Sequence, residues 1–384
     1  MLKVSVVKCS SYSANKISAS LSKALDSLGG FEKFAKPGMK VLLKVNLLGA
    51  FKPEKHVTTN PALLKAVIRL CQKQKCKVFV GDSPAISAGF GFRDAARIAG
   101  FEKVCSQTGA KFVELDEPVE RLSKNCHAAR RLFVSKKLEG FDLIINLPKL
   151  KTHVFTGYTG AVKNLYGCVP KRIKGQYHLR FPTPERFSRM LLDLHELVRP
   201  QLSIMDAVIG MEGNGPSAGK PKKIGLLLAS ENCLALDFVA LKAVGLDWRE
   251  IPSVFLAERL GLIDYSKVQV LGDSISFPAV KDFEPSASFK SGFNSARFLI
   301  SVFKPLLNQK PFLIPEKCTS CGKCFQVCPA KAIDFKTKKP VFDYGKCIRC
   351  FCCHEVCPEK AIEIRDSFLL GAMKKISGYL RHNA

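Results

Sequence analysis

The feature that most constrains this chain is a cysteine pattern that occurs twice near its C-terminal end. Three cysteines, each separated by two residues, are followed after three more residues by a fourth cysteine and a proline. The two copies are Cys318-x2-Cys321-x2-Cys324-x3-Cys328-Pro329 and Cys347-x2-Cys350-x2-Cys353-x3-Cys357-Pro358. A duplicated unit of this size predicts two halves related by pseudo-symmetry.

The spacing of these cysteines is typical of thiolate ligands to iron–sulfur cubes. Three sulfurs on one turning loop can bind three irons of one cube, whereas the fourth cysteine begins a helix that points away and reaches the other cube. We therefore expect two [4Fe-4S] clusters that share their ligands crosswise. The expected ligand sets are Cys318, Cys321, Cys324 and Cys357 for one cluster and Cys347, Cys350, Cys353 and Cys328 for the other.

Zinc is the alternative that these cysteines leave open, because sites built from CxxC pairs also bind zinc ion. A zinc site needs two pairs, whereas each copy here has a triplet followed by a fourth cysteine and a proline, which favours iron. Cys352 fits neither ligand set, and we expect it to be an inert thiol rather than a replacement ligand. Because clusters of this kind transfer single electrons, the region predicts electron transfer.

The remaining cysteines and the start of the sequence favour a reducing compartment. Seven of the 16 cysteines are scattered over the first 233 residues, unlike the disulfide framework of a short secreted chain. Residues 1–7 alternate like a strand, and no apolar signal segment or run of about 18 apolar residues occurs. We therefore expect a cytoplasmic protein without a transmembrane segment.

The net charge of +27, from 60 Lys and Arg against 33 Asp and Glu, favours acidic partners. It is consistent with an acidic redox partner protein or with an anionic small-molecule substrate. Nucleic acid is disfavoured, because no basic run is interleaved with stacking aromatics and the chain has a single Trp. A basic surface that is simply solvated is the alternative explanation.

The first 275 residues alternate between β-branched apolar runs and helical patterns, which predicts an α/β domain with a mainly parallel sheet covered by helices on both faces. The expected strands are Val4–Val7, Val41–Leu47, Val78–Val80, Leu143–Leu147, Ile204–Ile209 and Ile224–Leu228. The expected helices are Ile17–Leu28, Ala62–Gln72, Phe92–Ala99, Phe187–Val198 and Leu234–Val244. Asn60 before Pro61 marks a helix start, because Asn caps a helix and Pro fits its first position.

We expect four regions along the chain. Residues 1–275 form the α/β domain, and the Pro-, Ser- and Phe-rich residues 276–309 form a packed connector with a short helix at 293–303. Residues 310–366 form an α+β, two-cluster module, and residues 367–384 form an amphipathic basic tail.

Polar residues collect at the ends of the predicted strands, where α/β folds place their sites. The candidates for proton transfer or catalysis are Lys163, His153, Asp206 and Asp82. The candidates for binding an anion or substrate are Lys44, Asn46, Lys149, Lys151, Asn164, Glu212 and Asn214. For each residue alone, loop capping or surface charge is the simpler explanation. Neither GxGxxG nor a Walker sequence occurs, so no bound nucleotide is predicted.

Several motifs in the first 275 residues resemble those of the domain-of-unknown-function family 362. They are Lys44-Val45-Asn46, Thr59-Asn60-Pro61, Gly81-Asp82-Ser83-Pro84, Leu147-Pro148-Lys149-Leu150-Lys151-Thr152-His153, Gly160-Ala161-Val162-Lys163-Asn164-Leu165-Tyr166-Gly167, and Met205-Asp206 through Gly213-Asn214-Gly215-Pro216. Residues 316–366 resemble the bacterial two-cluster ferredoxin domain, a fusion that members of the first family often carry. The resemblance implies the fold and the fusion but no substrate, since the first family has no settled activity.

Two functions remain open from the sequence. In the first, the chain is an iron–sulfur oxidoreductase whose ferredoxin-like module passes electrons to or from a small-molecule or anionic substrate in the α/β domain. In the second, it is a non-enzymatic electron carrier or adaptor that docks an acidic protein. Clusters close to the region of Lys163 and His153 would favour the first function.

Overall fold

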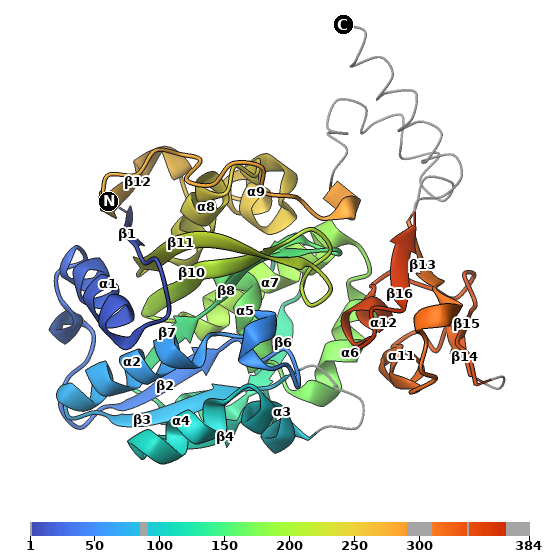
Figure 1. The fold of residues 1–384 in the computed structure, drawn as a ribbon, viewed down its shortest axis with the longest axis horizontal. Helices are drawn as coiled ribbons and strands as arrows, with labels where there is room; N and C mark the ends of the chain where they lie inside the picture. Colours follow the sequence, from blue (N-terminus) through green and yellow to red (C-terminus); the bar gives the residue numbers. More distant parts are fainter. Residues whose placement is uncertain (1, 85–90, 290–308, 336–337, 366–384) are drawn as a thin grey trace, which may run out of the picture.

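The computed structural model describes residues 2–84, 91–289, 309–335 and 338–365. The predicted helix at 293–303 and the predicted tail at 367–384 lie outside these residues, as does most of the predicted connector. Figure 1 shows a large α/β body with a smaller C-terminal lobe, drawn in orange and red, beside helix α6 (Lys171–Arg180). None of the helices within the described ranges combines the length and apolar composition that a membrane span requires.

A ten-stranded sheet forms the centre of the α/β body. Its order is β12-β1-β11-β10-β7-β2-β3-β4, with β8 paired to β10 and β9 paired to β8. The strands are β1 (Leu2–Lys8), β2 (Lys40–Val45), β3 (Lys77–Asp82), β4 (Lys111–Glu114), β7 (Leu143–Leu147), β8 (Lys149–His153), β9 (Gly157–Thr159), β10 (Leu202–Glu212), β11 (Lys220–Ser230) and β12 (Val268–Gly272). Neighbours run parallel except where β11 meets β1 and β10 and where β9 meets β8. The predicted mainly parallel sheet is therefore confirmed.

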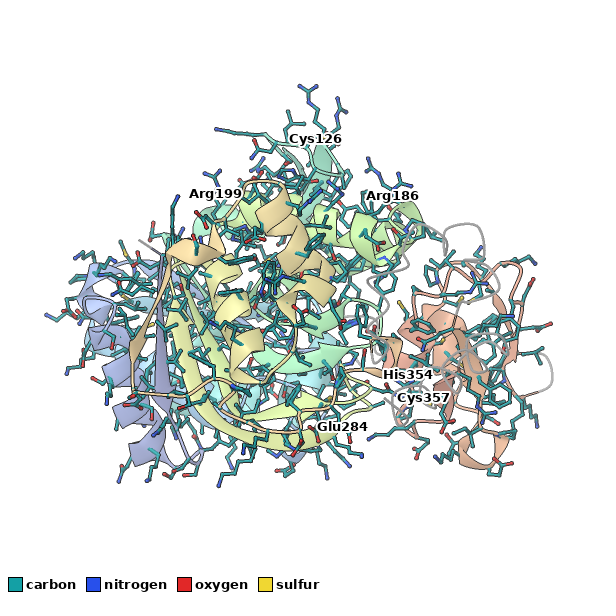
Figure 2. The ribbon with its side chains drawn as sticks, turned by 90° about the horizontal axis from the view of Figure 1, so that it is seen from above. Cys126, Arg186, Arg199, Glu284, His354 and Cys357 are labelled. Carbon is teal, nitrogen blue, oxygen red and sulfur yellow. The ribbon has the colours of Figure 1, made fainter. Side chains whose placement is uncertain are left out.

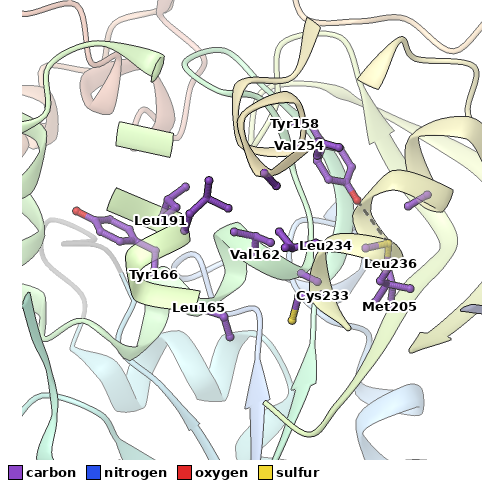
Figure 3. Close-up of a cluster of buried hydrophobic side chains, with 14 of the residues drawn as sticks. Tyr158, Val162, Leu165, Tyr166, Leu191, Met205, Cys233, Leu234, Leu236 and Val254 are labelled. Atoms are coloured by element: carbon purple, nitrogen blue, oxygen red, sulfur yellow. Dashed lines mark hydrogen bonds between the residues drawn. The ribbon is translucent and has the colours of Figure 1, made fainter. Parts of the chain in front are cut away.

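Alternate residues of the central strands face two separate hydrophobic cores. On β2, Val41 and Leu43 belong to one core and Leu42 to the other, as the two-residue period of a strand requires. The first core packs on α1 (Ala14–Asp26), α2 (Pro61–Lys73), α3 (Phe92–Ile98) and α4 (Phe101–Thr108), and the second on α5 (Ala161–Asn164), α7 (Pro184–Val198), α8 (Cys233–Ala243) and α9 (Pro252–Arg259). Figure 3 shows Val162 and Leu234 from two of these helices in the second core. Helices therefore cover both faces of the sheet, as predicted.

Two polar segments that the sequence pattern presents as loops are regular structure. Residues 149–153 form β8, all of whose side chains are buried, and residues 161–164 form α5. A hairpin of β5 (Pro118–Leu122) and β6 (Arg131–Ser135) was also not expected. Hydrophobic periodicity misses a buried strand rich in Lys, Thr and His, because such a strand is stabilised by specific polar partners rather than by apolar contacts.

The C-terminal lobe has two similar halves. Helix α11 (Lys323–Val327) lies in the first cysteine copy and α12 (Cys352–Glu355) in the second. Two small sheets complete the lobe, β13 (Lys310–Leu313) with β16 (Ile362–Arg365) and β14 (Ile333–Asp334) with β15 (Val341–Phe342). The backbone N–H of Ala332 donates to Cys328 Sγ and that of Ala361 donates to Cys357 Sγ, both at 3.2 Å. Equivalent positions of the two copies therefore make equivalent contacts.

The start of α2 tests the prediction that Asn60 caps this helix. The side chain of Asn60 accepts a hydrogen bond from Ala62 N at 2.9 Å, as predicted. We expect Asn60→Ala to lower the free energy of unfolding by about 1 kcal/mol, measured by urea denaturation followed by circular dichroism. Ser13 occupies the same position before α1 without a side-chain cap, so Ser13→Ala should change it by less than about 0.5 kcal/mol. Equal losses for the two variants would contradict the assignment.

Candidate functional site

The topology of the sheet opens a crevice at the carboxyl end of β2. The chain runs from β2 outward to β3 and β4 and then returns to β7 on the other side of β2. Loops that leave the two neighbours of β2 therefore turn in opposite directions, which creates a crevice at this switch point. Asn46 directly follows β2, Asp82 is the last residue of β3, and Lys149 lies two residues after the end of β7. Polar residues from three strands therefore meet at this edge.

An ion pair between Lys44 and Asp82 lies beneath the crevice. Lys44 Nζ is 3.1 Å from Asp82 Oδ2, and both side chains are almost completely buried. Asp82 also accepts hydrogen bonds from the backbone N–H groups of Leu47 and Ser83, both at 2.7 Å. Gly167 packs so closely that an added Cβ would overlap both members of the pair. The carboxylate of Asp82 is thus compensated within the protein by one ammonium group and two backbone N–H groups.

A second buried ion pair joins Lys149 and Asp206. Lys149 Nζ lies 2.9 Å from Asp206 Oδ2, with both side chains fully buried. Tyr12 accepts from Lys149 Nζ and donates to Asp206 Oδ1, at 2.7 Å in each case. The backbone N–H of Asn60 donates to Asp206 Oδ2 at 2.9 Å. The pair therefore ties β8 and β10 to the start of α2.

Lys151 is the third buried lysine of this edge and differs from the other two. Its Nζ donates to Asn46 Oδ1 at 2.9 Å and to the carbonyl of Val57 at 2.8 Å. Within the described chain, no carboxylate forms an ion pair with it. Asn46 in turn donates to Asn164 Oδ1 at 3.0 Å, and Asn164 donates to Asn146 Oδ1 at 2.7 Å. This chain of amides fixes the oxygen that Lys151 binds.

A cavity of about 120 Å³ lies between the crevice and the C-terminal lobe. The α/β body contributes strand ends, α5 and α6, and the lobe contributes Val327, Pro329, Cys352, Glu355 and Val356. The structure brings together five of the predicted site residues on this wall: Asn46, Asp82, Lys151, Lys163 and Asn164. The other predicted site residues of the α/β domain are not on the wall: Lys44, Lys149, His153, Asp206, Glu212 and Asn214.

The wall of this cavity is rich in positive charge. It carries Lys151, Lys163, Lys171 and Lys174, against the carboxylates of Asp82 and Glu355, and Lys44 already pairs with Asp82. Lys163 Nζ makes neither a hydrogen bond nor an ion pair with any residue in the described ranges. Burial lowers the pKa of Lys163, while Glu355 opposes that change. The cavity therefore favours an anionic occupant.

Helix α6 supplies two further groups to the wall. Lys174 donates to the carbonyl of Ser83, and burial lowers the pKa of Lys174 to about 7. His178 stacks on Phe187 at 4.7 Å between ring centroids, and its Nδ1 is buried without a partner among the described residues. Burial, then Lys163 and Lys174, lower the pKa of His178 to about 3, so a neutral imidazole faces the cavity.

His153 and Glu355 meet across the contact between the body and the lobe. His153 Nδ1 accepts the backbone N–H of Phe155 at 3.0 Å, so Nε2 carries the proton of the neutral ring. That Nε2 lies 3.4 Å from Glu355 Oε1. Burial lowers the pKa of His153 well below its usual range, and Lys163 adds to this. His153, a predicted catalytic residue, therefore lies at the contact between the body and the lobe and is absent from the cavity wall.

Two other contacts hold the lobe against the body. Ser217 Oγ donates to the carbonyl of Glu355 at 2.7 Å, and His354 Nε2 lies 3.4 Å from the carbonyl of Asn214. Figure 2 shows His354 on the side of the lobe that faces the α/β body. The side chain of Asn214 accepts from Ala287 N at 2.9 Å, and Glu212 lies 3.6 Å from Lys222. The structure thus gives Asn214 a role in docking and leaves Glu212 outside the site.

The predicted cluster ligands gather as four-thiol groups. Cys318, Cys321 and Cys324 line a small apolar cavity of about 20 Å³ together with Cys357 from the other copy. All 16 cysteines, every one within the described residues, are free thiols. Burial raises the pKa of Cys324 to about 11, and the sulfurs of Cys357 and Cys321 add to the rise. Because bound iron would reverse this by stabilising thiolates, the donor set fits an iron–sulfur cluster.

The second group surrounds Cys353. Burial raises the pKa of this thiol well above its usual range, and the sulfurs of Cys350, Cys347, Cys324 and Cys328 add to the rise. Burial also raises the pKa of Cys347, with the sulfurs of Cys350 and Cys328 contributing. Cys328 of the first copy is thus near enough to Cys347 and Cys353 to raise their pKa values, which is consistent with the crosswise arrangement.

Cys352, the extra thiol, lies between this second group and the cavity. Its hydrogen bond to Cys350 raises the pKa of Cys352 and lowers that of Cys350. Cys352 lines the cavity, whereas neither Cys350 nor Cys353 does. The thiol that matches neither ligand set therefore lies on the cavity wall and contacts a member of the second group.

A third cluster of possible metal ligands is better explained as a loop anchor. His127, Asp193 and Glu196 offer ligand atoms within 4.8 Å of one another. Asp193, however, already accepts from the backbone N–H groups of residues 127, 128 and 129 at 2.7–2.9 Å and from Ser123 Oγ at 3.2 Å. These four donors occupy the lone pairs of its carboxylate, so its role is to hold the loop next to α7.

Sequence reasoning did not identify Lys174, His178 and Glu355 as site residues. Lys174 and His178 lie on α6, and Glu355 is a spacer residue of the second cysteine copy. One signal was available: α6 has basic residues but almost no apolar stripe, and a helix of this type needs a polar neighbour or solvent. Their convergence depends on how the lobe docks, which no local pattern encodes.

Two family descriptions match the chain. A domain of unknown function, DUF362, matches residues 41–242, and a 4Fe-4S dicluster domain matches residues 310–358. The chain is also 39% identical over 260 residues to a thylakoid-associated protein of Synechocystis sp., covering 67% of this chain and 79% of that protein.

Two solved structures show weaker similarity. The lactate racemase apoprotein of Thermoanaerobacterium thermosaccharolyticum aligns over 61% of this chain and 55% of its own, with a TM-score of 0.42 and 15% identity. A protein from Thermotoga maritima aligns over 52% of this chain and 51% of its own, with a TM-score of 0.34 and 14% identity. The chain therefore spans about half the length of these two proteins.

The close approach of Gly167 to the Lys44–Asp82 pair gives a stability test. A Cβ at this position has to displace one of two fully buried charges. Breaking a buried pair costs about 3–5 kcal/mol, so we expect Gly167→Ala to lower the free energy of unfolding by about that amount in urea denaturation. A Cβ at Gly140 would meet nothing within 4 Å, and Gly140→Ala serves as the matched control. A loss below about 1 kcal/mol for Gly167→Ala would contradict the packing described.

Proposed function

The chain belongs to the DUF362 family and carries a 4Fe-4S dicluster domain, and on this premise we propose that it is an oxidoreductase that exchanges electrons with an anionic small molecule. The molecule binds in the cavity between the α/β body and the C-terminal lobe. The observation that carries the proposal is that both parts of the chain form the wall of this one cavity.

Two [4Fe-4S] clusters are assigned to the two four-thiol groups, one to Cys318, Cys321, Cys324 and Cys357 and the other to Cys347, Cys350, Cys353 and Cys328. When bound, these clusters supply one-electron transfer. The proximity of the second group supports exchange with the cavity, because Cys352 lies between two of its ligands in the sequence and lines the wall. Backbone N–H groups that donate to Cys328 and Cys357 contribute to the reduction potentials.

The protein side chains bind and orient the molecule. Lys163, whose amine has no partner among the described residues, binds its anionic group, and Lys174 lies on the same wall. The neutral His178 offers an unpartnered Nδ1 as a hydrogen-bond acceptor. The volume of about 120 Å³ suits a molecule of few atoms rather than a nucleotide. Ser217 and His153 contact Glu355 of the lobe and so lie where the lobe meets the body beside this site.

Electrons enter from an external partner in this proposal. The net charge of +27 supports an acidic redox protein as that partner, and we propose a cytoplasmic location. The Synechocystis relative is named for its association with thylakoids. For the present chain, association with a membrane surface would be a competing explanation of the basic charge.

Substrate-dependent oxidation of the clusters tests the proposal. The anaerobically purified protein is reduced with dithionite, freed of excess reductant and mixed with a panel of small carboxylates, phosphate esters and oxyanions. We expect at least one to restore the visible absorption of the oxidised clusters without any added protein. Oxidation by an added acidic redox protein alone would instead support the carrier function.

A lysine variant tests where that molecule binds. We expect Lys163→Met to raise the half-saturating concentration of the active anion by about tenfold or more, since a hydrogen bond to a charged group contributes about 1.5–3 kcal/mol. Lys267 lies on the surface with 72% of its side chain exposed, and Lys267→Met should leave the concentration unchanged. Equal behaviour of the two variants would place the anion elsewhere.

A further inference from the structure

The three buried lysines of the carboxyl edge are compensated in two different ways. Lys44 and Lys149 each form an ion pair with a carboxylate, at 3.1 and 2.9 Å. Lys151 is equally buried, with 1% of its surface exposed, but its Nζ contacts only two neutral oxygens. A carboxylate partner keeps a buried lysine protonated, whereas neutral acceptors do not offset the cost of burying its charge. Lys151 is thus placed where either protonation state is accessible.

The hydrogen bonds of Lys151 are compatible with both of these states. A neutral amine has two N–H groups and a lone pair, and an ammonium has three N–H groups. Asn46 Oδ1 and the Val57 carbonyl accept two N–H groups in either case. The residue also lines the cavity, and the two protein contacts leave one position of Nζ for a bound molecule. Gain or loss of a proton there leaves both protein contacts intact.

The charges around Lys151 favour release of this proton. Lys163 on α5 and Lys149 on β8 face it, with the neutral His153 of β8 nearby, and Glu355 on α12 and Asp82 on β3 oppose the two lysines. Burial, then Lys163 and Lys149, lower the pKa of Lys151 to about 7, against the opposing effect of Glu355 and Asp82. An acid or base is most effective when its pKa is near the working pH.

We propose that Lys151 exchanges a proton with the molecule in the cavity when that molecule gains or loses an electron, an inference that rests on the proposed function. In the reducing direction, an external ferredoxin-type donor supplies one electron through the lobe. The N–H bond of the ammonium breaks and its proton bonds to the reduced molecule, which leaves Lys151 as a neutral amine. A proton from water restores the ammonium, and a second electron and proton complete a two-electron reduction.

The other basic groups of the wall are less suited to this role. His178 is neutral, and a neutral imidazole has a proton on only one ring nitrogen. When Nε2 holds that proton, the unpartnered Nδ1 has none to donate. Lys174 is only half-buried, on a helix at the rim, and its amine is bound to the Ser83 carbonyl. Lys163 has the free amine that an anion needs. Lys151 alone combines deep burial on a strand with neutral, fixed acceptors.

Trace labelling of the loaded, full-length protein tests the state of Lys151 without any substrate. Acetic anhydride acylates only unprotonated amines, and peptide mass spectrometry reports each lysine over a range from about pH 5 to 10. We expect Lys151 to reach half-maximal labelling at about pH 7, with exposed Lys267 as the reference lysine in the same samples. Removing the like charge by Lys163→Met should shift the Lys151 midpoint upward. A midpoint near that of Lys267, or no labelling of Lys151 while Lys163 reacts, would overturn the proposal.

Variants then separate the proton from the charge. Arg stays protonated at any working pH, so Lys151→Arg retains the charge but cannot release a proton. With an anion that oxidises the reduced clusters, we expect both Lys151→Arg and Lys151→Met to slow that oxidation by about 100-fold and to abolish its dependence on pH near 7. Wild-type rates in Lys151→Arg would refute the proton transfer. If no anion oxidises the clusters while Lys151 is still labelled with a midpoint near pH 7, the proposed oxidoreductase function is refuted. The lowered pKa of Lys151 is then confirmed on its own, without a role in electron transfer.

Discussion

The structure depends on how positive charge is buried at the carboxyl edge of one sheet. Removing an ammonium group from water is costly unless a partner compensates it. Lys44 and Lys149 meet this requirement with Asp82 and Asp206, and these pairs also bring β2, β3, β8 and β10 together. The result is a rigid, polar edge at the point where α/β folds form their crevices. The cavity, its positive wall and the docking of the lobe all build on this edge.

The C-terminal lobe completes this edge rather than standing apart from it. Its α12 contributes Cys352 and Glu355 to the cavity wall, and Glu355 also meets His153 of the α/β body. The same short helix therefore lies beside a group of cluster-type cysteines and beside the lysines of the crevice. The region that matches a 4Fe-4S dicluster domain and the lysine-rich edge of the DUF362 domain thus line one cavity.

Particular residues show what the sequence could predict. The apolar runs located the strands, Asn60–Pro61 located a helix start, and the cysteine spacing predicted the crosswise grouping that brings Cys357 to the first copy. Polar strand ends led to Asn46, Asp82, Lys151, Lys163 and Asn164, which do line the cavity. The same rule also selected Asp206 and Lys149, which pair with each other away from the cavity wall, because sequence does not show which buried charges face a cavity. This rule could not identify Lys174, His178 or Glu355, because their positions in the cavity wall depend on packing between distant segments.

The most direct test of the account is anomalous diffraction from crystals of the anaerobically purified protein, recorded at the iron and zinc absorption edges. We expect two iron peaks and no zinc peak in the lobe. One peak should be surrounded by Cys347, Cys350, Cys353 and Cys328, next to the cavity wall at Cys352. Zinc in place of iron, or iron bound away from this wall, would contradict electron exchange with a molecule in the cavity.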